Sequence, residues 1–118
     1  MAKFKLKINQ NEMRALAVYC EVSAKSLMSV SALHQLIWVE TCERLWSRMR
    51  NMFRPDRDKY TLRLNASEVE TLTVFVLPEA QDSDDPFVRS MGFTMKEELE
   101  KQASREINIY NAMNYGNE

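Results

Sequence analysis

The stretch from Lys59 to Phe75, KYTLRLNASEVETLTVF, decides the fold, because the chain carries a second version of it from Lys3 to Tyr19, KFKLKINQNEMRALAVY. The two stretches lie 56 positions apart, and six of their 17 aligned positions are identical. Self-similarity at a fixed offset is the signature of repeat architectures. We therefore predict an internal repeat of two related halves, residues 1–57 and 58–118.

Both copies open with strict alternation of apolar and polar side chains. Alternation with a period of two is typical of a β-strand that buries one face and exposes the other. The basic side chains fall on the exposed face of each predicted strand. The side chains predicted to be buried are Phe4, Leu6, Ile8, Tyr60, Leu62 and Leu64.

An asparagine ends each alternating run and predicts the start of a helix. Asn9 is followed three residues later by Glu12, and Asn65 is followed in the same way by Glu68. Asparagine is a favoured N-cap because its side-chain oxygen accepts a hydrogen bond from an amide of the first turn. A glutamate three positions later can accept from the backbone amide of the cap, which completes a capping box. Each copy therefore encodes a strand, a corner and a helix.

Apolar spacing predicts the remaining helices. A helix over residues 10–24 is followed by a long helix over 30–53, whose middle is apolar nearly all round. The second capped helix is predicted to end near Leu77, because proline interrupts helices and Pro78 follows. A short helix is predicted from Pro86 to Gly92, and a capping box over residues 94–97 predicts the start of a last helix.

These elements predict an α+β fold that is dominated by helices, in the order β-α-α-β-α-α. The chain of 118 residues is long enough for one modest core, so we expect a single domain over residues 1–118, with a frayed tail at 114–118. Two short strands form only a marginal ribbon, which must pack on helices. The sequence leaves open whether the strands pair with each other or across a dimer.

Composition argues against a membrane or secreted protein. No apolar run approaches the length of a membrane span, and the basic N-terminus lacks the apolar region of a signal peptide. Cys20 and Cys42 have no metal-binding spacing and are expected to be buried and reduced. We therefore expect a cytoplasmic protein.

Catalytic and metal-binding patterns are weak, and we predict neither an enzyme nor a cofactor. His34 is the only histidine, and no nucleophile or orienting acid is marked near it. The acidic run Asp82, Asp84 and Asp85 lacks the glycine and terminal glutamate of a calcium loop. A chain with two glycines has no glycine-rich phosphate loop.

The leading functional hypothesis is a small interaction protein that forms a homodimer, alone or with an unknown protein partner. The doubly apolar long helix, or the unpaired strand edges, would supply the interface. Methionines and aromatic residues suit an adaptable binding surface, although most such residues belong to cores. The candidate interface residues are Trp38, Trp46, Met49 and Phe53.

Arginines on the long helix support an alternative, contact with a nucleic acid. The candidate phosphate contacts are Arg44, Arg48, Arg50 and Arg54. Residues 1–57 carry a net charge of +5 and residues 58–118 carry −6, so this basic surface belongs to the first half. The acidic second half and the slightly acidic pI of about 5.9 make a dedicated nucleic-acid binder the less favoured reading.

Overall fold

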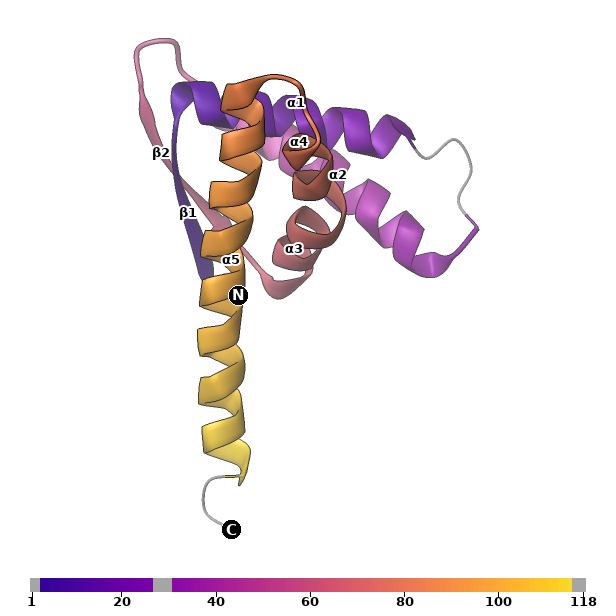
Figure 1. Cartoon of the computed structure of the whole chain (residues 1–118), viewed down its shortest axis with the longest axis vertical. Helices are drawn as coiled ribbons and strands as arrows, with labels where there is room; N and C mark the ends of the chain where they lie inside the picture. The colour runs from indigo at the N-terminus through magenta and orange to yellow at the C-terminus, as the bar shows by residue number, and fades with distance from the viewer. Residues whose placement is uncertain (1–2, 27–30, 116–118) are drawn as a thin grey trace.

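A computed structural model describes residues 3–26 and 31–115 (Figure 1). In chain order the elements are β1 (Phe4–Asn9), α1 (Gln10–Ser26), α2 (Leu33–Met52), β2 (Lys59–Leu64), α3 (Ala66–Thr71), a π-helical segment η1 (Leu72–Val76), α4 (Leu77–Gln81) and α5 (Pro86–Tyr115). The helix-dominated α+β class is confirmed. The predicted beginning of the long helix at residue 30, and residues 116–118 of the predicted tail, lie outside the described residues.

β1 and β2 form one antiparallel ribbon, in which Phe4 lies opposite Leu64 and Asn9 lies opposite Lys59. The strands therefore pair within the chain, which answers the question that the alternation left open. All six side chains that were predicted to face inward are buried. The other face of the ribbon is exposed, as a period of two requires.

Both predicted capping boxes are present. The amide of Asn9 donates to Glu12 Oε1 at 2.8 Å, and the amide of Glu12 donates to Asn9 Oδ1 at 2.8 Å. At the second corner, the amide of Asn65 donates to Glu68 Oε1 at 2.9 Å and the amide of Glu68 donates to Asn65 Oδ1 at 2.8 Å. The corner thus occurs twice, but the helices that follow differ, and a common origin of the halves stays a prediction.

One hydrophobic core joins elements of both halves. Its buried side chains come from the inner face of the ribbon and from every helix of the described chain. α1 packs along α2, and α4 packs along α5, while α5 also contacts β1. The largest fully buried side chains are Met13, Leu16, Leu45, Met49, Leu62, Leu64, Leu72, Leu77 and Leu99.

The predicted end of the second capped helix at Leu77 is wrong, since helical backbone continues through Pro78 to Gln81. Proline lacks an amide and its ring clashes with the carbonyl four residues earlier. Here the preceding residues form a π-helical segment, and the amide of Leu77 donates to the carbonyl of Leu72, five residues back. The wider turn accommodates the proline ring, so the chain continues as α4 instead of ending.

The predicted break at Gly92 is also wrong, because α5 is one helix from Pro86 to Tyr115. A Cβ atom at Gly92 would lie 3.0 Å from the backbone nitrogen of Gln81 and 3.1 Å from the Cβ of Ala80. The glycine therefore allows α4 and α5 to approach closely. Its role is packing between helices, and the predicted capping box at residues 94–97 lies inside the helix.

The C-terminal half of α5 projects beyond the rest of the molecule (Figure 1). The first half is anchored by Met91, Met95 and Leu99, which are buried. The radius of gyration is 15.2 Å, above the value of about 13.5 Å that a compact domain of this length has. Although α5 has 30 residues, no helix in the described part of the chain is long and apolar enough to cross a membrane.

Candidate interaction surfaces

Two of the four candidate arginines, Arg44 and Arg48, lie beside a buried carboxylate. Glu68 is 4% exposed, and its Oε2 atom accepts from Arg48 Nη2 and lies 3.6 Å from Arg44 Nε. Arg48 Nη1 also donates to the backbone carbonyl of Arg63 at 3.0 Å. Both arginines therefore hold the second corner against α2. Sequence reasoning assigned Glu68 to the cap alone and missed this partner on a distant helix.

The other two arginines make separate contacts. The guanidinium of Arg50 lies 4.7 Å from the centre of the Trp46 indole ring. Arg54 Nη1 donates to the carbonyls of Asn51 and Phe53, at 3.0 and 2.7 Å, at the end of α2. Each of the four predicted arginines thus has a partner within the chain.

Three of the four candidate interface residues line one groove between α1 and α2, which we call the α1–α2 groove. Its volume is about 350 Å³. Met49 is 1% exposed and lies in the core, whereas Trp46 and Phe53 are partly exposed. The groove is lined by Met13, Arg14, Ala17, Val18, Trp46, Met49, Arg50 and Phe53.

The fourth candidate, Trp38, belongs to a different cluster. Its indole stacks on the ring of Phe75 with centroids 5.2 Å apart and planes 17° apart. The ring of His34 meets the indole edge-on at 4.9 Å. Trp38 therefore joins α2 to η1, and the only histidine of the chain packs as part of this aromatic cluster.

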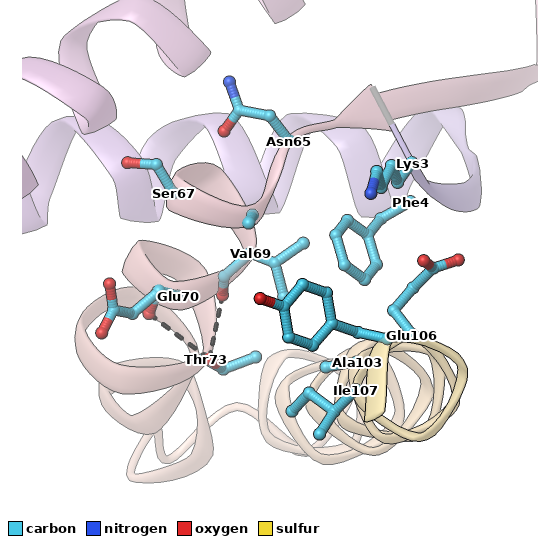
Figure 2. A pocket seen from close by; sticks show the side chains of 12 residues that line it. Lys3, Phe4, Asn65, Ser67, Val69, Glu70, Thr73, Ala103, Glu106 and Ile107 are labelled. Carbon is cyan, nitrogen blue, oxygen red and sulfur yellow. Dashed lines mark hydrogen bonds between the residues drawn. The ribbon is translucent and has the colours of Figure 1, made fainter. Parts of the chain in front are cut away.

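A larger groove lies between α3 and α5, and we call it the α3–α5 groove (Figure 2). Its volume is about 790 Å³. Phe4 and Val69 reach into it from β1 and α3, and Ala103 and Ile107 from α5 (Figure 2). Its polar rim includes Lys3, Asn65, Ser67, Glu70, Thr73 and Glu106.

An exposed apolar stripe continues along the projecting half of α5 and borders this groove. Ile107, Tyr110 and Met113 are 58%, 63% and 76% exposed. They recur at intervals of three residues, which places them on one face of the helix. The periodicity of the sequence indicates such a stripe. It does not reveal that this part of α5 extends beyond the core, so that the stripe is left exposed.

Both outer edges of the ribbon are hydrogen-bonded by side chains from helices at one residue pair, in which Lys5 lies opposite Arg63. Gln102 of α5 accepts from the amide of Lys5 at 3.0 Å and donates to its carbonyl at 2.8 Å. On the other edge, Arg48 donates to the carbonyl of Arg63. Three backbone groups that could recruit a further strand, the amide and carbonyl of Lys5 and the carbonyl of Arg63, are thus already bonded.

Groups with catalytic potential lie apart from these surfaces. Cys20 and Cys42 are both free and buried. Burial raises the pKa of the Cys20 thiol and raises the pKa of the Cys42 thiol to about 12. Protonated thiols are poor nucleophiles. Within residues 3–26 and 31–115, no cluster of three or more His, Cys, Asp or Glu side chains could hold a metal ion.

The candidate surfaces are therefore two apolar grooves on separate helix pairs. Each groove is bordered by charged side chains and by partly exposed apolar ones. No family model, curated protein or solved structure matches the chain.

Proposed function

We propose that this chain is a non-enzymatic interaction protein that acts as a homodimer, and that the projecting half of α5 forms the interface. The observation that carries the proposal is the exposed stripe of Ile107, Tyr110 and Met113 on a helix that extends beyond the core. Fully burying one large apolar side chain contributes about 1.5–3 kcal/mol. Covering this stripe would therefore stabilise an association strongly.

A partner would also stabilise the helical conformation of the projecting half of α5. Isolated helices shorter than about 12–15 residues are marginal in water, and most helices are stabilised by packing of an apolar face. Ala103 is the last apolar residue of α5 that packs against the core, and the helix continues beyond it to Tyr115. A second chain would supply the missing packing surface.

The α3–α5 groove supports a second copy as the partner, because an apolar floor and an exposed apolar stripe lie side by side on one surface. Apolar floor residues such as Val69 and stripe residues such as Ile107 border the same groove. A twofold axis would place the stripe of each copy over the floor of the other, which is the isologous arrangement of most dimers. Lys3 of one copy would then meet Glu70 or Glu106 of the other across the rim.

The interfaces expected from the sequence are less well supported. Gln102 and Arg48 donate hydrogen bonds to backbone carbonyls on the two strand edges. Met49 of the long helix is buried in the core. The alternative of nucleic-acid contact also loses support, because Arg44 and Arg48 share the Glu68 carboxylate, which offsets one of their two positive charges. The projecting half of α5 keeps its support, because Ile107, Tyr110 and Met113 are exposed along it and Ile107 and Tyr110 border the α3–α5 groove.

Sedimentation equilibrium of the purified chain at micromolar concentration tests the proposal. We expect a mass of twice the 13.8 kDa chain. Ile107→Asp should give monomers because a carboxylate would be buried in the interface. Phe93→Asp is the matched control, since Phe93 lies on the anchored half of α5 with 57% exposure against 58% for Ile107.

Two results would count against the dimer. The first is a single-chain mass for the unmodified protein at 100 micromolar, a concentration chosen to favour association. The second is a dimer that survives Ile107→Asp. Far-ultraviolet circular dichroism of each variant separates loss of association from loss of fold.

A further inference from the structure

The α1–α2 groove carries a second binding feature that the dimer does not use. Two aromatic rings in the wall of this groove are each covered by an arginine side chain. The guanidinium of Arg14 lies 4.9 Å from the centre of the Phe53 ring, and that of Arg50 lies 4.7 Å from the centre of the Trp46 ring. Both arginine residues are exposed. Stacking on a ring holds each cation at the mouth of the groove.

The two cations have no acidic partner in the described residues. In residues 3–26 and 31–115, the arginines that pair with a carboxylate within 4.0 Å are Arg44 and Arg48, and both pair with Glu68. Arg14 and Arg50 therefore present positive charge outward. Arginine in such a position favours a carboxylate ligand, because its planar fork matches carboxylate geometry.

The interior between them is apolar. Met13, Ala17 and Met49 line it, and Val18, which is 54% exposed, stands at its border. A volume of about 350 Å³ lies within the range of about 300–1,000 Å³ that is typical of binding pockets. The space suits large apolar side chains inserted from outside.

We propose that the α1–α2 groove binds an acidic amphipathic helix of a partner protein. Apolar side chains on one face of that helix enter the groove, and its flanking carboxylates pair with Arg14 and Arg50. This is recognition of a helix in a groove, with anchors spaced at i, i+4 and i+7. Arg14 and Arg50, which stack on aromatic rings but pair with no carboxylate in the described residues, favour a partner of negative charge. The apolar lining of the groove favours an amphipathic one.

A single-stranded nucleic acid is the less favoured occupant. Such strands bind by stacking bases on exposed aromatic faces. At Trp46 and Phe53, guanidinium groups already cover a ring face. A base would have to displace them and lose the contact with the cation, whereas a helix with carboxylates keeps both arginines in place.

Selection from a displayed library of random 16-residue peptides tests the proposal, with the full chain and its Arg14→Glu/Arg50→Glu variant as baits. We expect peptides selected by the unmodified chain to be enriched in Asp and Glu beside apolar residues spaced four and seven apart. A synthetic peptide of the enriched sequence should bind the variant at least tenfold more weakly. It should also shift the emission of Trp46 in a Trp38→Phe protein, in which Trp46 is the only tryptophan.

Matched variants separate the groove from general electrostatics. Lys101→Glu/Arg105→Glu makes the same change of charge at exposed positions on α5 and should keep the affinity. Arg14→Gln/Arg50→Gln removes the charges without adding negative ones, and should also weaken binding if the protein with two glutamates unfolds.

Four outcomes would overturn the proposal. Enriched peptides that are not acidic would exclude pairing of the partner's carboxylates with Arg14 and Arg50. Equal affinity for the Arg14→Gln/Arg50→Gln variant would exclude the two arginines. Displacement of the peptide by a single-stranded oligonucleotide that binds more tightly would assign the groove to nucleic acid. Conversion of a dimer to monomers by Arg14→Gln/Arg50→Gln would assign it to a second copy of the chain.

Discussion

Arg48 and Glu68 join the long helix to the second strand-to-helix corner through one carboxylate. Glu68 Oε2 accepts from Arg48 Nη2, while Glu68 Oε1 accepts from the amide of Asn65 at 2.9 Å. The carboxylate is thus part of a capping box and of an ion pair at the same time. At the first corner, Glu12 makes the capping contacts but has no ion pair in the described part of the chain.

We predict that Glu68→Ala destabilises the protein more than Glu12→Ala does. Glu12→Ala should lower the free energy of unfolding by about 1 kcal/mol, the value of a helix cap. Glu68→Ala also removes a hydrogen bond between a buried carboxylate and a charged arginine, so it should lower the free energy of unfolding by about 2–3 kcal/mol. The loss is no larger because about a third of the Arg48 side chain is exposed, and solvent screens its attraction to Glu68. Urea denaturation of both variants measures the difference. Equal losses would mean that the ion pair adds nothing to the cap.

Gly92→Ala should destabilise the protein, although alanine is the better helix former. In an open helix this change stabilises by about 1 kcal/mol. Here the new methyl group would meet the backbone of α4 at 3.0 Å, and overpacking costs about 1–3 kcal/mol. Ser104→Ala at an exposed position of α5 is the control and should leave the melting temperature nearly unchanged. A higher melting temperature for Gly92→Ala would show that α4 moves aside freely.

Tyr60→Phe should loosen the turn that leads into β2. The Tyr60 hydroxyl accepts from the amide of Arg54 at 3.0 Å and lies 3.0 Å from the carbonyls of Arg54 and Arg57. Removing it leaves partly buried backbone groups without their partner, at a cost of about 1–2 kcal/mol. Amide hydrogen exchange should accelerate at Arg54, and Tyr19→Phe is the control. Unchanged exchange at Arg54 would contradict this role of the hydroxyl.

Alkaline conditions should destabilise the protein partly through Cys42. Burial raises the pKa of its thiol from 9.0 to about 12, so the folded chain holds a proton that the unfolded chain releases. The stabilisation is complete below pH 9 and is lost as the pH rises towards 12, with a slope of about 1.4 kcal/mol per pH unit. Urea denaturation between pH 8 and 11 under reducing conditions measures this slope. Cys42→Ala should show a shallower decline, and parallel curves would exclude the thiol as a cause.

Local patterns predicted the corners of this fold well. The alternation of Phe4, Leu6 and Ile8, and the spacing of Asn9 from Glu12, depend on contacts within a few residues. Such contacts follow directly from strand and helix geometry. The helix-dominated α+β class followed from them.

Features set by distant contacts were not predictable in the same way. Gly92 was interpreted as a helix end because its contact with Ala80 belongs to another helix. Pro78 was interpreted as a stop because a π-helical turn has no clear sequence signal. Among the candidate residues, Trp46 and Phe53 share a groove, whereas Trp38 lies on Phe75, and only tertiary packing decides between these places.

The pairing of Asn9 with Lys59 has a consequence for the order of folding. β1 and β2 meet at the ends of a loop that contains all of α1 and α2. Closing a long flexible loop is entropically costly, so the sheet should form after these helices have paired and shortened it. In stopped-flow refolding, we expect Leu16→Ala on α1 to slow folding, whereas Gln102→Ala, at the outer edge of β1, should mainly accelerate unfolding. The helical hairpin would then be the nucleus on which the ribbon is assembled.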